Sequence, residues 1–398
     1  MPIPTPYYAV WEITLACNLK CTHCGSRAGK ARDRELTTDE CYRVVDQLAD
    51  LGVQEVTLIG GEAYLRDDWD LVLKRIADKG MRPSMATGGR GITKERVIRA
   101  RDAGITSVGV SIDGMEAAHD KLRGVPGSWR WAMLALDLFR DAGVRIASNC
   151  QVNRVNLRDL EALCDALLDK GIEGWQVQIT AALGRAADHP EMLLQPFDML
   201  EFIPRLARLK EKCEARGVDL GPGNNVGYFG PYESILRRRF GRNIHWEGCG
   251  AGVTTIGIES DGTFKGCPSL QTADYTAGNL LEQSAREIWE NSQSLQKHRD
   301  FSRKDLWGFC ATCYYADTCK AGCRFTAHGL LGKAGNMPYC YHRAETLKAQ
   351  GQREVLVPVE RAPGLPFDNG RFELKLEPYR EEMIDGPVPQ LQPARFTV

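Results

Sequence analysis

A regular alternation of strand-like and helix-like segments over residues 7–180 is the feature that most restricts how this chain can fold. Short apolar runs rich in β-branched and aromatic residues alternate with longer amphipathic stretches of helical period. Glycines follow the helix-like stretches, as they do at helix C-termini. The expected strands are residues 7–14, 55–59, 82–86, 107–112, 145–152 and 175–179, and the expected helices between them are residues 38–51, 69–79, 94–103, 129–142 and 157–170.

Six strand–helix units in succession predict a parallel sheet covered by helices and joined by right-handed crossovers. Eight such units are needed to close a (β/α)8 barrel. We therefore expect an α/β protein whose first domain is a partial (β/α)6 TIM-like barrel, open on one side. Thr37 and Glu40 have the spacing of a capping box at the start of the first helix.

The composition excludes several classes of partner. With 43% hydrophobic and 26% charged residues among 398, the chain can bury an extensive core. Its formal net charge of −1 gives no reason to expect a nucleic acid partner. The sequence has no signal-peptide pattern and no run of about 20 apolar residues, so we expect no membrane partner. These features predict a cytoplasmic protein with reduced thiols.

Fourteen cysteines require an explanation. A disulfide framework is typical of secreted domains below about 100 residues, not of a chain this long. Ten cysteines fall into two groups, three at residues 17–24 and seven at residues 249–340. The other four lie mostly in periodic apolar segments, where we expect small buried hydrophobic side chains; they are Cys41, Cys150, Cys164 and Cys213.

Cys17, Cys21 and Cys24 form a C-x3-C-x2-C loop directly after the first expected strand. Three thiolates on one loop can bind three irons of a cubane iron–sulfur cluster, which usually takes four cysteines. One iron is then left for a ligand from outside the loop. This spacing resembles the signature of the radical S-adenosylmethionine (SAM) enzymes, in which the amino and carboxylate groups of SAM chelate that iron.

The resemblance implies an enzymatic activity that depends on cofactors. The three cysteines of the loop would be the catalytic cluster ligands, and SAM would be a cofactor. Reductive cleavage of SAM would give a 5′-deoxyadenosyl radical, which takes a hydrogen atom from an unactivated carbon. The protein would supply orientation and exclude water.

Turns after the later strands also resemble SAM-binding segments of this family. Gly60 and Gly61 would let the backbone approach the cofactor, and the Glu62 carboxylate would receive its ammonium group; Ala63 stands where the family has proline. Thr87 is followed by two glycines where many relatives have Asn-Gly. The other residues that the resemblance assigns to SAM are His23, Ser111, Asp113, Arg123, Asn149, Gln178 and Leu183.

The seven C-terminal cysteines form a second pattern, Cys249-x17-Cys267, then Cys310-x2-Cys313-x5-Cys319-x3-Cys323 and, after sixteen residues, Cys340. A pair of zinc ribbons is the alternative interpretation. The spacing resembles the SPASM domain, a small cysteine-rich α+β domain with auxiliary iron–sulfur clusters, so three [4Fe-4S] clusters are expected in all. By resemblance, one auxiliary cluster is bound by Cys310, Cys313, Cys319 and Cys340, and the other by Cys249, Cys267 and Cys323.

The auxiliary cluster with three cysteines needs a further ligand or has an open iron that could hold substrate. His245 and Glu247 are the side chains near Cys249 that could complete it. Auxiliary clusters imply that an electron leaves the substrate after hydrogen abstraction. The resemblance therefore favours a net oxidation over a rearrangement.

Four parts follow along the chain: a radical SAM barrel at residues 1–220, a bridge at 221–245, a SPASM domain at 246–345 and a proline-rich tail at 346–398. A hairpin is expected at residues 254–265. The tail has seven prolines from residue 358 onward, which disfavours a helix and leaves room for one short strand at 372–376. Tyr228 in the bridge could line a substrate cavity or pack between the domains.

SPASM proteins commonly modify ribosomally made peptides, so the first interpretation is an oxidative peptide maturase that forms a crosslink, ring or double bond. A separate leader-peptide-binding protein would then be a partner. The alternatives are a radical SAM dehydrogenase or coupling enzyme for a small metabolite or cofactor precursor, and a non-catalytic iron–sulfur electron carrier. A reducing donor such as flavodoxin or ferredoxin is expected. The sequence does not rank the candidate general bases, which are Asp113, Glu173, Tyr64 and Tyr228.

Overall fold

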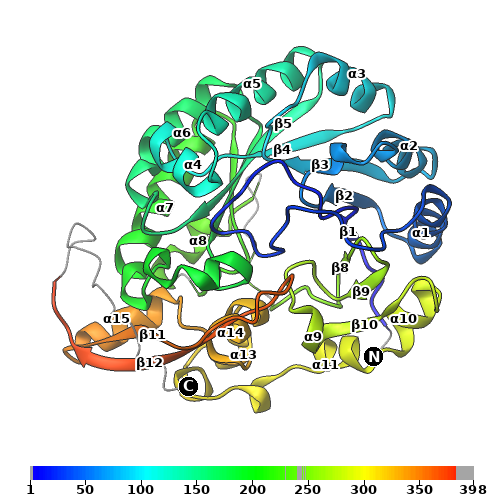
Figure 1. Cartoon of the computed structure of the whole chain (residues 1–398). Helices are drawn as coiled ribbons and strands as arrows, with labels where there is room; N and C mark the ends of the chain where they lie inside the picture. Colours follow the sequence, from blue (N-terminus) through cyan, green and yellow to red (C-terminus); the bar gives the residue numbers. More distant parts are fainter. Residues whose placement is uncertain (1–2, 229, 240–243, 245, 247, 382–398) are drawn as a thin grey trace.

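The computed structural model describes residues 3–228, 230–239, 244, 246 and 248–381. Its centre is a ten-stranded sheet in the order β10-β9-β8-β1-β2-β3-β4-β5-β6-β7. Strands β1 to β8 run parallel, and β9 and β10 are antiparallel to their neighbours. The sheet curves into an open barrel with α1–α7 on its outer side (Figure 1). The fold class predicted from the sequence is therefore confirmed.

The strands of the sheet are β1 (Tyr8–Glu12), β2 (Glu55–Ile59), β3 (Arg82–Thr87), β4 (Ser107–Ser111), β5 (Arg145–Val152), β6 (Gly174–Ile179), β7 (Asp219–Pro222), β8 (Thr255–Ile258), β9 (Thr263–Lys265) and β10 (Thr276–Asn279). A second sheet pairs β11 (Gln352–Glu360) with β12 (Arg371–Pro378).

The helices of the barrel are α1 (Thr38–Leu51), α2 (Trp69–Asp78), α3 (Lys94–Asp102), α4 (Glu116–Arg123), α5 (Ser128–Asp141), α6 (Leu160–Asp169) and α7 (Met199–Glu214). Shorter helices follow: α8 (Glu233–Leu236), α9 (Thr272–Tyr275), α10 (Ala285–Asn291), α11 (Gln293–Arg299), α12 (Phe309–Thr312), α13 (Ala316–Cys319), α14 (Arg324–Leu331) and α15 (Tyr341–Ala349). Within the described residues, no helix is both long and apolar enough to cross a bilayer.

Local signals explain where the first helix begins and ends. The Thr37 hydroxyl accepts a hydrogen bond from the Glu40 amide, and the Glu40 carboxylate accepts one from the Thr37 amide, so the predicted capping box is present. Gly52 ends the helix in the left-handed conformation, at a φ of 96°. Such a conformation is strained for residues with a side chain.

The two faces of the sheet differ in character. Alternate residues such as Trp11 and Trp175 are buried against the helices and form the hydrophobic core. The inner face is polar, because Tyr8 Oη and Thr57 Oγ1 are 2.7 Å apart and Thr57 Oγ1 is 2.6 Å from Ser84 Oγ. The four cysteines outside the two groups are each 1% exposed or less, which confirms the prediction that they are small buried side chains. The core therefore lies outside the barrel and leaves a polar interior.

The boundary between the barrel and the cysteine-rich region is less sharp than the sequence suggests. Strand β8 belongs to the predicted hairpin, yet it pairs parallel with β1 in the register Tyr8↔Thr255 to Trp11↔Ile258. On the other edge, β7 adds a further parallel strand beside β6. The six-stranded sheet expected for the barrel is thus extended at both edges.

The strand expected at residues 372–376 lies within β12, and the proline-rich residues 358–381 form no helix, as expected; the sequence did not predict β11, which pairs with β12 in a hairpin. Pro358 lies within β11, opposite Phe372, where the register shifts between Pro358 and Glu360. Proline is tolerated at such an irregular position of an edge strand because its missing N–H is not needed by a neighbour. Leu356 and Phe372 are buried against the core, which stabilises the hairpin.

Candidate active site

The first cysteine loop lies just beyond the C-terminal end of β1, where active sites of α/β barrels are built. Cys17, Cys21 and Cys24 are free thiols, and the amide of Cys24 donates to the carbonyl of Cys21 at 3.4 Å. Burial, with smaller contributions from Glu62 and the two neighbouring thiols, raises the pKa of Cys17 to about 12, and burial also raises the pKa of Cys21. Three free thiols on one loop fit the binding of an iron–sulfur cluster.

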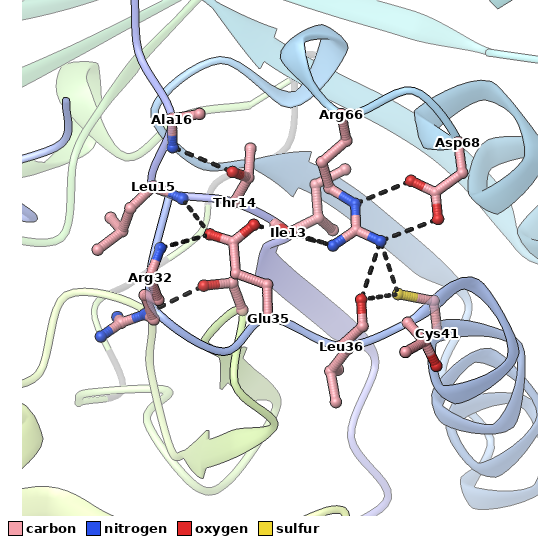
Figure 2. A network of polar contacts seen from close by, with 12 residues as sticks. Ile13, Thr14, Leu15, Ala16, Arg32, Glu35, Leu36, Cys41, Arg66 and Asp68 are labelled. Atoms are coloured by element: carbon pink, nitrogen blue, oxygen red, sulfur yellow. Dashed lines mark hydrogen bonds and ion pairs between the residues drawn. The ribbon is translucent and has the colours of Figure 1, made fainter. Parts of the chain in front are cut away.

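A polar network fixes the chain that leads into this loop (Figure 2). Glu35 accepts hydrogen bonds from the Leu15 amide at 2.9 Å and from the Arg32 amide at 3.1 Å. Arg66 donates to the Ile13 carbonyl at 3.1 Å and is held by Asp68. Glu35 and Arg66 therefore hold residues 13–15 in place immediately before the cysteine loop.

Gly60 and Gly61 are needed for a close approach between two backbone segments. A Cβ on Gly60 would lie 2.3 Å from the Thr14 carbonyl oxygen, and one on Gly61 would lie 2.1 Å from that of Ala16. The amide of Gly61 donates to the Thr14 carbonyl at 2.8 Å. The sequence assigned these glycines to the cofactor, whereas the structure places them against the base of the cysteine loop.

Glu62 is buried beside the cysteine loop. Its carboxylate accepts hydrogen bonds from Thr87 Oγ1 at 2.5 Å and from the Gly88 amide at 2.6 Å. Burial raises the pKa of Glu62 to about 7, although these two hydrogen bonds favour the charged form. The Thr87-Gly-Gly turn at the end of β3, which differs from the Asn-Gly of many relatives, therefore holds the Glu62 carboxylate that the sequence assigned to the SAM ammonium.

Asp113, Arg123 and His23 form a buried charged cluster. The Oδ2 atom of Asp113 lies 2.5 Å from Arg123 Nη2 and 2.9 Å from His23 Nε2. Burial opposes ionisation of Asp113, but Arg123 and then His23 hold its pKa below the usual range. Arg123 also donates to Cys21 Sγ at 3.7 Å. All three residues were expected at SAM, and in this structure they bind one another next to a cysteine of the loop.

The remaining residues expected at SAM lie on the inner face of the sheet or near the C-terminal ends of its strands. Ser111 ends β4 and is in register with Asn149 of β5. Gln178 lies near the end of β6, in register with Gln151. Leu183 packs against the cysteine loop, since a Cβ on Gly25 would lie 3.0 Å from its Cδ2 atom.

Arg185, two residues after Leu183, also contacts the cysteine loop. Its guanidinium donates to the Cys21 carbonyl at 2.7 Å and to the Ala28 carbonyl at 3.1 Å. Its amide donates to the Cys24 carbonyl at 3.0 Å. Arg185 therefore shapes the cysteine loop from the segment that follows β6.

Four of the C-terminal cysteines line one small apolar cavity of about 20 Å³. They are the four that the resemblance assigned to one cluster, Cys310, Cys313, Cys319 and Cys340. Tyr315, Phe309, His342 and Tyr228 line the same cavity. Tyr228, which the sequence placed at a substrate cavity or between domains, stacks on Tyr315 with ring centroids 4.2 Å apart.

Burial raises the pKa of Cys267 to about 11 and that of Cys323 to about 12; the nearby Cys249 thiol contributes to both shifts, and the Cys267 thiol contributes to the second. Arg324 and Tyr275 lie near Cys249 and Cys323. The two suggested further ligands, His245 and Glu247, lie outside the described residues. The structure therefore brings together the three cysteines assigned to this cluster.

The two cysteine centres nearest the barrel lie at opposite ends of the β1–β8 pair. Cys17 follows the C-terminal end of β1, whereas Cys249 precedes β8, which runs in the same direction. Each of these strands spans only about 15 Å at about 3.3 Å per residue. The barrel interior therefore lies between the two centres.

Comparisons with known proteins agree with this arrangement. Residues 11–167 match the family model of the radical SAM superfamily, and residues 249–314 match SPASM, an iron–sulfur cluster-binding domain. The chain is 30% identical over 359 residues to the AdoMet-dependent heme synthase of Methanosarcina barkeri, covering 85% of this chain and 97% of that protein. The chain belongs to the radical SAM superfamily.

Two further matches widen the comparison. Mycofactocin maturase MftC of Mycolicibacterium smegmatis is 29% identical over 325 residues, with 81% of this chain and 79% of MftC covered. The crystal structure of anSMEcpe with bound AdoMet and a peptide has the same fold, with a TM-score of 0.67, 18% identity, and 86% of this chain and 95% of that chain covered.

The chain is thus a radical SAM enzyme with a SPASM domain, and these domains imply SAM and iron–sulfur clusters as cofactors. This sets aside both the electron-carrier interpretation and the zinc ribbons. The free thiols of the N-terminal loop and of the C-terminal cavity are the donors that such clusters require.

Proposed function

We propose that this radical SAM enzyme oxidises a small carboxylated metabolite of the porphyrin class. The likeness to an AdoMet-dependent heme synthase over 97% of that protein supports this substrate class better than the peptide that the sequence favoured. Cys17, Cys21 and Cys24 would hold the SAM-binding cluster, and the seven C-terminal cysteines would hold two auxiliary clusters. When bound, SAM and a reduced cluster supply the radical that removes a hydrogen atom from an unactivated carbon.

The observation that carries this proposal is a cavity with several cationic side chains at the N-terminal ends of β4 to β7, which extends along the sheet and reaches the residues beside Cys249. It has a volume of about 790 Å³ and is lined by inner-face residues of β5 and β6, such as Asn149 and Gln176. Ligand-binding cavities typically have volumes of about 300–1,000 Å³. A planar metabolite larger than an amino acid therefore fits the space.

The charge of the cavity favours an anionic ligand. Among the described lining residues, Arg145, Lys210, Arg237, Arg238 and Arg239 carry positive charge, and two residues are acidic, Glu173 and Asp219. Asp219 is already paired with Lys210 and Arg239, each at 2.9 Å. Arg237 is paired with Glu233 at 3.6 Å and Arg238 with Glu214, so among the described lining residues Arg145 is the guanidinium available to a substrate carboxylate, which it can bind with two parallel hydrogen bonds.

Arg145 is the lining cation best placed to bind a substrate carboxylate. It begins β5, donates to the Thr106 carbonyl at 3.3 Å and forms no ion pair with any described residue. The cavity also reaches the auxiliary centre, because Gly248 and Gly250 on either side of Cys249 line it. A substrate radical in this cavity would lie next to a site that can accept its electron.

A reconstitution assay tests the substrate class. The anaerobic enzyme is loaded with iron and sulfide and given SAM, dithionite as the donor, and coproporphyrin III with or without iron. We expect the porphyrin to stimulate formation of 5′-deoxyadenosine and to be converted to an oxidised product detected by mass spectrometry. SAM cleavage that no porphyrin stimulates would contradict the porphyrin class while leaving the radical SAM chemistry intact.

Arg145→Met then tests the cavity. Loss of a charge-assisted contact predicts a KM for the porphyrin raised about tenfold, with cleavage of SAM in the absence of substrate unchanged. Arg140→Met is the matched control, because Arg140 is an exposed arginine of α5 that pairs with Asp137 and Asp141. An unchanged KM in Arg145→Met would remove this residue from the site.

A peptide substrate is the second candidate, and the 29% identity to MftC supports it. A short peptide encoded beside the gene, added with its own leader-binding protein where one is present, would be the probe. Peptide-dependent formation of 5′-deoxyadenosine, with no response to porphyrin, would favour this candidate. Flavodoxin or ferredoxin would be the physiological donor in either case.

A further inference from the structure

The loop that joins β11 and β12 reaches the N-terminal cysteine loop, more than 340 residues away in the sequence. We refer to residues 361–370 as the clamp loop. The amide of Phe367 donates to the Gly25 carbonyl at 3.1 Å, next to Cys24. The Asp368 carboxylate accepts a hydrogen bond from Arg27 Nε at 2.8 Å, and its carbonyl accepts one from the Gly184 amide at 2.7 Å. The clamp loop thus contacts two segments that flank the SAM centre.

Arg27 connects these segments through its side chain. Its guanidinium also binds the Asp188 carboxylate, at 2.5 and 2.9 Å, and the Gly184 carbonyl at 3.0 Å. Arg27 has a φ of 51°, in the left-handed region that residues with a side chain rarely adopt. Such strain persists where surrounding contacts hold it in place and is concentrated at functional sites.

Phe367 links the clamp loop to the auxiliary domain. It is buried, with a φ of 56°, and the Nζ atom of Lys265 lies 4.0 Å from its ring centroid. Lys265 is fully buried, pairs with Glu259 at 2.6 Å and comes two residues before Cys267. Adjacent residues of the clamp loop therefore contact the first cysteine loop and the strand that leads to an auxiliary cysteine.

The clamp loop is itself pre-organised by the same carboxylate. Asp368 Oδ2 accepts hydrogen bonds from the amides of Gly364 at 2.5 Å and Leu365 at 2.9 Å. Its Oδ1 atom is left for Arg27. One side chain therefore both shapes the loop and attaches it to the cysteine loop, which reduces the ordering required when a ligand binds.

We propose that Asp368 is a positioning residue for SAM, which acts by clamping the cysteine loop to the segment 183–189. Leu183 and Arg185 of that segment already pack on the cysteine loop, so the spacing between the two segments determines the space for the cofactor. The proposal rests on the radical SAM assignment and is independent of the substrate.

SAM binding to the reconstituted full chain tests the clamp. For Asp368→Asn we expect the Kd for SAM to rise about tenfold, because a charge-assisted hydrogen bond to the cysteine loop is lost. The change that SAM causes in the electron paramagnetic resonance spectrum of the reduced N-terminal cluster should weaken in parallel. The auxiliary cluster signals and the iron content should stay as in the wild type, which separates a local effect from unfolding.

Two further variants complete the test. Asp368→Glu keeps the negative charge and should restore at least part of the SAM affinity. Glu360→Gln is the matched control, since Glu360 pairs with Arg371 at 3.2 Å in the exposed part of the same hairpin, and it should bind SAM normally.

Wild-type SAM affinity and spectra in Asp368→Asn would overturn the proposal. If Asp368→Asn loses all its clusters, Arg27→Lys is the variant to measure instead. It keeps the positive charge but lacks the guanidinium group that binds both Asp368 and Asp188. Weakened SAM binding with intact auxiliary signals in Arg27→Lys would support the clamp, and unchanged binding would overturn it.

Discussion

The N-terminal cysteine loop and the cavity lined by Cys310, Cys313, Cys319 and Cys340, which we call the outer cavity, each bring several thiols together. The two sites differ in how many charged side chains surround the thiols. Charged residues lie around the loop, where Arg123 contacts Cys21 and the buried Glu62 carboxylate lies beside Cys17. The outer cavity is lined mainly by aromatic and aliphatic groups, including the stacked pair of Tyr228 and Tyr315, and its charged lining residue Arg343 is neutralised by Glu354 at 2.6 Å.

This difference corresponds to two chemical tasks. A centre that binds a zwitterionic ligand needs fixed charges of both signs nearby, held in a site with little water so that they act strongly. A centre that only passes electrons needs saturated ligation and an apolar shell that limits solvent access. Three thiols on the loop and four around the cavity agree with that division.

Removing one thiol from each centre gives the largest expected contrast. Cys17→Ala should abolish SAM cleavage, since the loop then offers two thiols, while about eight of twelve irons are retained. Cys310→Ala should keep SAM cleavage but lower the yield of oxidised product. Iron and sulfide counts and the amount of 5′-deoxyadenosine distinguish the two results.

The same pair of variants can break the comparison. Loss of SAM cleavage in Cys310→Ala, with the N-terminal cluster intact by spectroscopy, would mean that the outer centre takes part in radical generation. Cys213→Ala is a control of the same chemical type, because its buried thiol lies 3.6 Å from that of Cys164, far from either set in the sequence. It should leave both the iron content and the cleavage unchanged.

Asp113→Asn should have the next largest effect, this time on stability. Asp113 is fully buried and neutralises Arg123, which is itself 8% exposed. Removing one partner of a buried ion pair typically costs about 3–5 kcal/mol, because the other charge is left without compensation. Urea unfolding of the barrel should show this loss, and a change below about 1 kcal/mol would mean that water or a ligand replaces the carboxylate.

The parts of the fold that the sequence predicted are those with strong local periodicity. The bounds of β2, β5 and α1 agree with the structure residue for residue, because apolar spacing, the Thr37 cap and Gly52 all act locally. Helix α4 was missed. It has eight residues and a mainly polar composition, so its hydrophobic pattern is short.

Long-range partners could not be predicted in the same way. The ion pair between Asp113 and Arg123 could not be predicted, because the choice of partner for a buried charge depends on tertiary packing rather than on nearby sequence. The hairpin β11–β12 was hidden by its prolines, and the contact of Asp368 with Arg27 joins opposite ends of the chain. Cysteine spacing is a partial exception, because the three cysteines of the N-terminal loop and Cys310, Cys313 and Cys319 recur at short intervals.

The smallest expected effect concerns the aromatic shell of the outer cavity. Tyr315 stacks on Tyr228 and contacts His342 edge-on, with ring centroids 5.0 Å apart. In Tyr315→Leu both contacts are lost, at about 1 kcal/mol for each aromatic pair, and solvent gains access to the thiols. We therefore expect a several-fold faster loss of the visible cluster absorbance in air, with SAM cleavage under anaerobic conditions unchanged. Tyr314→Leu is the matched control, because Tyr314 also contacts Tyr315 edge-on at 5.0 Å but is 88% exposed and does not line the cavity. Equal air sensitivity of the two variants would show that the aromatic side chains do not protect the thiols of the outer cavity. The difference between the two sites would then concern only the binding of SAM at the charged N-terminal loop.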